Sequence, residues 1–307
     1  FFFGSHVMLF SRLGRISAMA ACGLGLGGSL VAQLDFPTLC AKIMPRSKTK
    51  GFAWRSWREY EVEQVENLNS TTKKIRFAFE DNDLEAGIRV VSVILGRCKG
   101  DGDQYVRAPY YPVTRNSDLG HFDLVVKRTE DPVSQHLHSL KVGDKAEFKG
   151  ALPILPYRVG QYSTLGLVAG GTGIIPLYML IQEILSNPQE TTKISLLYAA
   201  KDKSELLFKS HLDKLAQKHP QQFRVEYCVE QKPWFWSGHV GRLTKQMVAS
   251  NMPRPGRAVT IAVSGPESMM EAVCGTTDLD KAGWPTQGPV KGLLHECGYR
   301  KSHVFKF

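Results

Sequence analysis

Three glycines in the run V-A-G-G-T-G-I-I-P, from Val168 to Pro176, could place a phosphate group against the main chain. They stand between a short apolar strand and an apolar helix. Glycine tolerates positive φ angles and the close approach of a ligand, and the unpaired amides of a helix N-terminus attract anions. The run differs from the usual dinucleotide pattern G-x-G-x-x-G, and a tight turn without a ligand is the alternative. We predict a nucleotide-binding turn at Gly170, Gly171, Thr172 and Gly173.

Two further segments could complete a nucleotide site beside this turn. Glu205 follows the next strand, and a carboxylate there can accept hydrogen bonds from a ribose 2′-hydroxyl while it repels a 2′-phosphate. This favours NADH over NADPH, although acids are also common in the first turn of a helix without a ligand. The run S-G-P-E-S-M-M, from Ser264 to Met270, ends a third strand. Gly265 and Pro266 would open a space near the glycine turn if the two strands are neighbours.

The elements that position these residues differ between the two halves of the chain. Alternating apolar and polar residues predict antiparallel strands at 59–68, 73–79, 89–96, 121–128 and 144–150. Later, strands at 165–171, 194–200, 224–230 and 258–265 alternate with helices at 174–185, 203–219, 244–252 and 266–275. We therefore predict an antiparallel barrel or sandwich, followed by a parallel sheet with helices on both faces.

Length and composition agree with two globular domains. The 307 residues are 43% hydrophobic, so each domain can bury a core. The net charge of +10 is uneven, because residues 1–58 carry eight Lys and Arg against one acid, Asp35. This asymmetry indicates targeting or an anionic membrane surface rather than nucleic-acid binding. The six cysteines form no C-x-x-C pair and the histidines form no H-x-x-x-H cluster, so we predict neither a disulfide framework nor a metal site.

The N-terminal region contains an uncharged run from Ile16 to Leu34, about long enough to cross a bilayer. Its Ala- and Gly-rich composition suits either a single-span anchor or a cleaved mitochondrial presequence. We favour the anchor, because more Lys and Arg follow the run than precede it. We predict a targeting segment or membrane anchor at 1–36 and a basic linker at 37–53.

Five motifs follow one another along the rest of the chain: R-A-P-Y-Y-P-V-T, F-D-L-V-V-K, V-S-Q-H-L, V-A-G-G-T-G-I-I-P and S-G-P-E-S-M-M. In this order they resemble the NADH-cytochrome b5 reductase branch of the ferredoxin-NADP reductase superfamily, from about residue 54 to residue 307. The resemblance implies a six-stranded antiparallel FAD-binding barrel at 54–160 and a parallel-sheet NAD-binding domain at 161–307. It also implies hydride transfer from NADH to FAD, and release of single electrons to a haem or iron–sulfur protein such as cytochrome b5.

The resemblance also assigns roles to individual residues. Tyr110 would pack against the flavin ring, and Ser134 would belong to the turn that cradles the pyrophosphate. Thr172 and Ser264 would be the catalytic positions, because they would shape the geometry of hydride transfer. The other cofactor-binding positions are Arg107, Tyr111, Pro112, Val113, Thr114, Lys127, Val133, Gly170, Gly171, Gly173, Glu205, Gly265, Pro266 and Met269.

Several positions depart from the family's motifs. Ala108 holds the place of the flavin-motif arginine, one residue after Arg107, and a β-bulge would restore Arg107 to that place. Asp131 and Pro132 stand in a region where the family carries glycine, so the pyrophosphate turn gains a negative charge and loses an amide donor. Ser264 replaces a cysteine.

Two functions are open on the sequence alone. The first is a membrane-anchored NADH reductase whose flavin domain presents a basic rim to an acidic haem protein. The second is a catalytically reduced or inactive accessory subunit of a mitochondrial membrane complex, which keeps the fold after its flavin site has decayed. The endoplasmic reticulum membrane is the alternative location. Flavin binding distinguishes the two functions.

Overall fold

The computed structural model describes residues 51–53, 55–100, 102, 104–115, 117–155, 157–279 and 285–307. The segment predicted at 1–36 and nearly all of the basic linker lie outside the described residues. Among the residues that the structure describes, no helix is both long and apolar enough to cross a membrane. The chain forms two compact units, and the second begins at Tyr157, close to the boundary predicted after residue 160.

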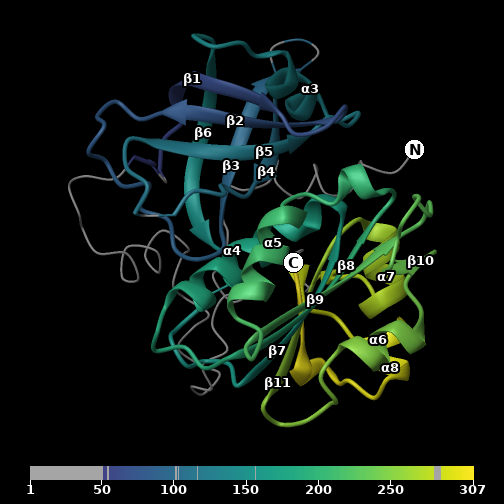
Figure 1. Cartoon of the computed structure of the whole chain (residues 1–307). Coiled ribbons are helices and arrows are strands. Elements are labelled where there is room, and N and C mark those ends of the chain that lie inside the picture. Colours follow the sequence, from purple (N-terminus) through teal and green to yellow (C-terminus); the bar gives the residue numbers. More distant parts are fainter. Residues whose placement is uncertain are drawn as a thin grey trace. The chain divides into compact units, whose positions relative to one another are not determined.

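The first unit is built on six antiparallel strands (Figure 1). They are β1 (Arg58–Asn67), β2 (Thr72–Ala78), β3 (Ser92–Lys99), β4 (Tyr105–Tyr110), β5 (His121–Lys127) and β6 (Lys145–Pro153), in the spatial order β4-β3-β6-β1-β2-β5. The alternation is visible in β1, where Tyr60 and Val62 are buried between exposed neighbours. The prediction of six antiparallel strands is confirmed, although β4 is not among the five strands that the alternating pattern predicts.

The segment after β4 closes this sheet into a barrel. Pro112 forms a bridge with Leu124 of β5, and the amide of Val113 donates to the carbonyl of Asp123 at 2.9 Å. Because β4 and β5 are the two edges of the sheet, these contacts satisfy main-chain groups that an open edge would expose. Aromatic rings fill the interior, with centroids 4.9 to 6.1 Å apart among Tyr60, Phe77, Phe122 and Phe148.

A helix that the sequence analysis treated as a turn, α3 (Pro132–Ser139), packs against β3, β4 and β5. Proline suits the first helical position, because that position needs no amide donor. Asp131 is the N-cap, and its side chain accepts a hydrogen bond from the amide of Ser134. The apolar side chains of Val133 and Leu137 are buried beneath the helix. The segment expected to form the pyrophosphate turn is therefore the start of a helix that Asp131 caps.

The second unit contains a parallel sheet. Its strands are β7 (Thr164–Gly170), β8 (Lys193–Ala200), β9 (Phe223–Val229), β10 (His239–Val240), β11 (Val259–Ser264) and β14 (Val304–Lys306), in the order β10-β9-β8-β7-β11-β14. From β7 the chain proceeds through β8 and β9 in one direction, while β11 lies on the other side of β7. In such sheets ligands bind beyond the carboxyl ends of the strands where the order reverses. A short hairpin of β12 (Asp278–Leu279) and β13 (Pro285–Thr286) lies outside this sheet.

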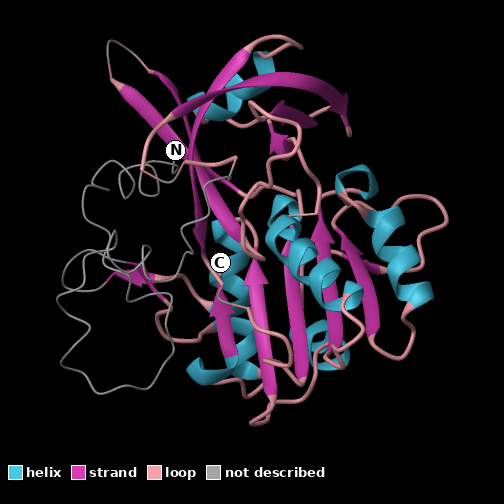
Figure 2. Ribbon diagram, turned by 90° about the vertical axis from the view of Figure 1, so that its left-hand side faces the viewer, coloured by secondary structure: helices cyan, strands magenta, loops and turns pink. Residues whose placement is uncertain are grey.

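Helices cover both faces of the parallel sheet (Figures 1 and 2). The helices α4 (Ile174–Ser186) and α5 (Lys209–Lys218) lie on one side, and α6 (Lys245–Asn251), α7 (Glu267–Cys274) and α8 (Gly292–Glu296) on the other. Single turns of 3₁₀ helix form η3 (Gly171–Gly173), η4 (Lys203–Glu205) and η5 (Lys301–His303). The predicted parallel sheet with helices on both faces is confirmed.

The continuous helix predicted at 203–219 is wrong, because α5 begins only at Lys209. Phe208 adopts a left-handed φ of 59°, which breaks the helix. The ring of Phe208 stacks on Tyr178 of α4, with centroids 4.2 Å apart. Packing against a neighbouring helix therefore overrides the local helical pattern.

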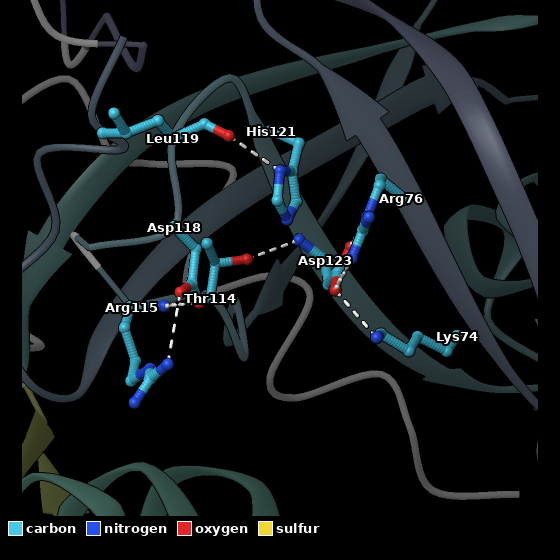
Figure 3. A network of polar contacts seen from close by, with 8 residues as sticks. All are labelled: Lys74, Arg76, Thr114, Arg115, Asp118, Leu119, His121 and Asp123. Carbon is cyan, nitrogen blue, oxygen red and sulfur yellow. Dashed lines mark hydrogen bonds and ion pairs between the residues drawn. The ribbon is translucent and has the colours of Figure 1, made fainter. Parts of the chain in front are cut away.

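An ion-pair network around Asp123 joins two strands of the barrel (Figure 3). The carboxylate of Asp123 accepts hydrogen bonds from Arg76 Nε at 2.8 Å and Arg76 Nη2 at 3.0 Å, and Lys74 Nζ lies 2.9 Å away. Burial alone would raise the pKa of Asp123, but these bonds from Arg76 and Lys74 hold it below its ordinary value. Asp123 is therefore a charged group that β2 stabilises.

Replacing this carboxylate should weaken the barrel. We expect Asp123→Asn to lower the free energy of unfolding by about 1–3 kcal/mol, because it leaves Arg76 and Lys74 without their counter-charge. A lowered pKa means that the carboxylate stabilises the fold above its unfolded pKa of about 3.9 and that this contribution disappears as pH falls through the folded pKa. The difference between wild type and variant in urea unfolding should therefore shrink below about pH 4.

Asp118→Asn provides the matched control for this experiment. Asp118 pairs with Arg115 at 3.3 Å, and both side chains are substantially exposed, so its loss should cost less than about 1 kcal/mol. A pH-independent difference for Asp123→Asn, or an equal effect of both variants, would contradict the proposed role of the network.

Candidate nucleotide and flavin site

The predicted nucleotide turn lies at the switch point of the parallel sheet. Gly170 ends β7, residues 171–173 form the single turn η3, and α4 begins at Ile174. Gly171 has a φ of +51°, and a Cβ atom placed on it would meet no other atom within 4 Å. This glycine therefore turns the chain without a neighbour above it, which leaves the main chain open to a ligand.

The turn is packed directly against the end of β11. The two strands are neighbours, and the register places Ser264 opposite Ala169. A Cβ atom on Gly173 would collide with the carbonyl oxygen of Ser264, and one on Gly170 would collide with the sulfur of Met269. Glycine is required at Gly173, because the collision there is with main chain, whereas a side chain at Gly170 would require Met269 to move. The expectation that the glycine turn and the 264–270 segment lie together at one sheet edge is confirmed.

The N-terminus of α4 is available to an anion. Gly173 is its N-cap and supplies no side-chain hydrogen bond, and the first turn carries no acidic residue. In this first turn the amide of Ile174 donates to the carbonyls of Gly171 and Thr172, and Pro176 has no amide. The helix dipole still places positive potential beside the nucleotide turn, where a pyrophosphate group would lie, so the residues present fit the pyridine nucleotide.

A tyrosine that the sequence analysis missed joins the nucleotide turn to the acidic segment after β8. Tyr198 is fully buried, and its hydroxyl lies 3.1 Å from the carbonyl of Gly171 and 3.3 Å from that of Glu205. The same hydroxyl accepts the amide of Leu207 at 3.0 Å. Asp202 caps η4 by accepting the amides of Ser204 and Glu205. The hydrogen bonds of the Tyr198 hydroxyl therefore fix the position of Glu205 relative to the nucleotide turn.

The predicted flavin strand runs from β4 into the segment that closes the barrel. Tyr110 is half-buried and pairs with Ile94 of β3. Burial raises its pKa, and the nearby negative charge of Asp131 raises it further. Burial also raises the pKa of Tyr111 to about 12. Both phenols therefore stay neutral at physiological pH and can offer a ring face and a hydroxyl to a cofactor.

Three more predicted flavin residues are held by the barrel closure. Pro112 makes the bridge to β5, Val113 donates its amide to Asp123, and the hydroxyl of Thr114 accepts the amide of Asp123 at 2.6 Å. Thr114 is almost completely buried. Bonds to β5 therefore fix the position of this segment, as a seat for a planar ring requires.

Arg107 does not take the place of the flavin-motif arginine. The pairing of β3 with β4 is regular from Tyr105 to Tyr110, so the β-bulge suggested by the sequence is absent. Arg107 is opposite Arg97, whereas Ala108 is opposite Gly96, on the other face of the sheet. The guanidinium of Arg107 lies 5.9 Å from the ring of Trp57, and its Nε is buried without a hydrogen-bond partner among the described residues. Arg107 and Tyr110 thus face opposite sides of the strand.

The predicted pyrophosphate residues are engaged within the protein. The hydroxyl of Ser134 donates to the carbonyl of Lys127 at 3.0 Å and accepts the amide of Thr129 at 2.9 Å. The side chain of Val133 is completely buried. The segment from Tyr110 to Thr114 thus fits an isoalloxazine ring. Ser134 and Val133, by contrast, do not form an open phosphate-binding site.

Two protein-family models match the chain in the order of its two units. The oxidoreductase FAD-binding domain matches residues 59–157, and the oxidoreductase NAD-binding domain matches residues 167–275. With the barrel and the nucleotide turn, they define an FAD- and NAD-dependent oxidoreductase.

Similar proteins narrow this class. NADH-cytochrome b5 reductase 2 of Aspergillus terreus is 35% identical over 291 residues, which cover 94% of this chain and 88% of that protein. The corresponding Neurospora crassa protein is 34% identical over 281 residues, 90% of this chain and 81% of that protein. The cytochrome b5 reductase domain of Ulva prolifera nitrate reductase has a TM-score of 0.71 and 26% identity, and covers 84% of this chain and all of that one. The chain belongs to the NADH-cytochrome b5 reductase family.

The cofactors of this oxidoreductase are therefore FAD and NADH. None of the comparisons favours the inactive accessory subunit that the altered flavin motifs suggested. The individual contacts of Thr172, Ser264, Gly265 and Pro266 with the nicotinamide stay predictions, as do those of Lys127 with the flavin.

Removing the Tyr198 hydroxyl should weaken NADH binding. We expect Tyr198→Phe to raise KM for NADH about fivefold while kcat is nearly unchanged, because the loss of a buried hydrogen bond frees the loop of Glu205 from the nucleotide turn. Steady-state kinetics with ferricyanide as electron acceptor measure both constants.

Tyr227→Phe is the matched control for Tyr198→Phe. Tyr227 of β9 is paired with Tyr198 of β8. Its hydroxyl donates to Asp213 of α5 at 2.7 Å, away from the nucleotide turn. We expect this variant to lose stability but keep its KM. A fall in kcat alone, or the same rise of KM in both variants, would show that Tyr198 does not position the nucleotide loops.

Proposed function

We propose that this oxidoreductase transfers electrons from NADH through FAD to a haem protein such as cytochrome b5. The observation that carries the proposal is the open N-terminus of α4 behind the glycine turn, packed against the end of β11. It supports a nucleotide bound across the switch point of the sheet. The relatives named NADH-cytochrome b5 reductase support the choice of acceptor.

The side chains of the chain bind and orient rather than react. The positive end of α4 and the main chain of the glycine turn hold the pyrophosphate of NADH, and Glu205 accepts hydrogen bonds from hydroxyls of its ribose. Thr172 and Ser264 confine the nicotinamide between two tightly packed turns. Bound FAD supplies the conversion of a hydride into two single electrons. No side chain has to act as a general acid or base in this sequence.

The charge distribution bears on how an acidic haem protein would approach. Residues 59–156 carry 13 Lys and Arg against 16 Asp and Glu, a net charge of −3. Residues 157–307 carry 18 against 12, a net charge of +6. The first unit as a whole is therefore acidic, and the basic rim expected on it stays a prediction. The attraction that speeds the encounter with an acidic partner comes mainly from the second unit and the N-terminal region.

The test combines two electron acceptors with one donor. In the purified full-length protein supplied with FAD, NADH should bleach the flavin absorbance and then reduce cytochrome b5, seen in the haem spectrum. The rate with cytochrome b5 should fall steeply as salt rises, because the encounter is electrostatic, while the rate with ferricyanide serves as the control for flavin reduction. Reduction of ferricyanide without reduction of cytochrome b5 would leave the oxidoreductase but reject this acceptor.

We also infer that residues 1–36 place the reductase at a membrane, most simply the mitochondrial one. The support is the uncharged run from Ile16 to Leu34 with basic residues on both sides. In fractionated cells the full-length chain should sediment with mitochondrial membranes and resist extraction by alkaline carbonate. Recovery in the soluble fraction would contradict an anchor, and recovery with endoplasmic reticulum membranes would contradict the organelle.

A further inference from the structure

The N-terminus of α3 is already occupied by an anion of the protein itself. Oδ1 of Asp131 accepts the amide of Ser134 at 2.9 Å, and the carbonyl of Asp131 accepts the amide of Gln135 at 3.0 Å. Pro132, at the first helical position, has no amide to offer. In α4, by contrast, no side chain caps the first turn. One helix N-terminus is open to a phosphate, and the other is filled by a carboxylate.

The hydroxyl that the family resemblance assigns to the pyrophosphate is also engaged. Ser134 is only 3% exposed, and its Oγ both donates to the carbonyl of Lys127 and accepts the amide of Thr129. These bonds fix the loop between β5 and α3. A phosphate oxygen at this place would have to displace a main-chain bond as well as the carboxylate, and each buried group left unpaired costs free energy.

The arginine that the family resemblance places beside the pyrophosphate is not on this face of β4, and Lys127 is the basic residue that the resemblance leaves near the flavin. Ala108 holds the arginine position and is 8% exposed, while Arg107 faces the opposite side of β4 with Arg97 and Trp57. The charge of Asp131 reaches this region, since burial and then Asp131 raise the pKa of Cys98 as they do that of Tyr110. A diphosphate here would meet a fixed negative charge in place of a guanidinium.

We propose that Asp131 is the residue that sets the flavin affinity of this chain, because its carboxylate occupies the place at α3 where a flavin pyrophosphate would bind. The protein then holds FAD through its isoalloxazine and ribityl parts, at the segment from Tyr110 to Thr114, and the diphosphate contributes little. The bound flavin is exchangeable, and FAD is only weakly preferred over riboflavin. This inference rests on the FAD-dependent activity proposed above and adds how the cofactor is held.

The test measures flavin affinity rather than turnover. Purified full-length protein is freed of flavin and titrated with FAD and with riboflavin, whose fluorescence reports binding. In Asp131→Asn the amide still caps α3, because asparagine is as good an N-cap as aspartate, but the negative charge is gone. We expect the dissociation constant for FAD to fall about tenfold and that for riboflavin to stay the same, because only FAD carries a diphosphate.

Glu130→Gln is the matched control. It removes one exposed carboxylate from the adjoining residue and leaves the cap of α3 intact, so FAD affinity should change by less than about twofold. Thermal unfolding with and without flavin shows that the variants fold, and Asp131→Ser serves as a second cap if Asp131→Asn does not fold.

Several results would overturn the proposal. These are an unchanged FAD affinity in Asp131→Asn, an equal gain in Glu130→Gln, and a wild-type protein that binds FAD a hundredfold or more tightly than riboflavin. Failure of both wild type and Asp131→Asn to bind any flavin would overturn it together with the FAD-dependent function. A protein that binds flavin as expected but does not reduce cytochrome b5 would reject only the acceptor.

Discussion

The flavin half of the molecule depends on one constraint, the pairing of residues 112–114 with β5 that turns an open sheet into a barrel. Asp123 is the centre of this pairing. Its amide and carbonyl bond to Thr114 and Val113, while its carboxylate bonds to Arg76 and Lys74 of β2. One residue therefore connects β2, β5 and the closing segment. Because that segment is also the predicted seat of the flavin ring, the geometry of the seat follows from the closure of the barrel.

The nucleotide half depends on a different constraint, which is the contact of main chain with main chain at the switch point. The collision that a Cβ atom on Gly173 would make with the carbonyl group of Ser264 shows how little space separates the glycine turn from the end of β11. Tyr198 extends this packing to the segment after β8. Turn, acidic segment and β11 terminus are thus held as one group, which allows a nucleotide to be oriented without any large movement of side chains.

The sequence predicted those parts of the structure that a local pattern of residues determines by itself. The glycine turn could be found because only glycine allows both a positive φ and close packing, and the parallel sheet because short strands alternate with helical patterns along this half of the chain. The missed elements depend on partners far away in the chain. Pro109 argues locally against a strand, yet β4 is held by its ladder with β3. Phe208 ends a helical pattern because Tyr178 provides a stacking surface.

The candidate site likewise contains residues whose role the local sequence indicates and residues whose role depends on contacts with distant segments. Asp131 could be recognised as an unexpected charge, but D-P-x-S also fits a helix start with an aspartate N-cap and a proline in the first turn, and only the helix α3 makes that meaning clear. The place of Arg107 depended on whether β4 contained a bulge, which one residue of register decides and composition does not. Tyr198 gave no signal beyond a tyrosine in an apolar strand. Its role follows from three bonds to segments that the fold brings together.

The two helix N-termini explain how one chain can keep its hydride donor site and alter its flavin site. Each helix directs the positive end of its dipole toward its first turn, although Pro132 in α3 and Pro176 in α4 have no amide, so each N-terminus favours an anion. At α4 the residues before the helix are glycines, and the anion must come from outside. At α3 the preceding residue is an aspartate, and the protein provides the anion itself. A single side chain at the N-cap therefore decides whether a helix in this fold binds a phosphate or is stabilised without one, while the strands that carry both helices stay as they are.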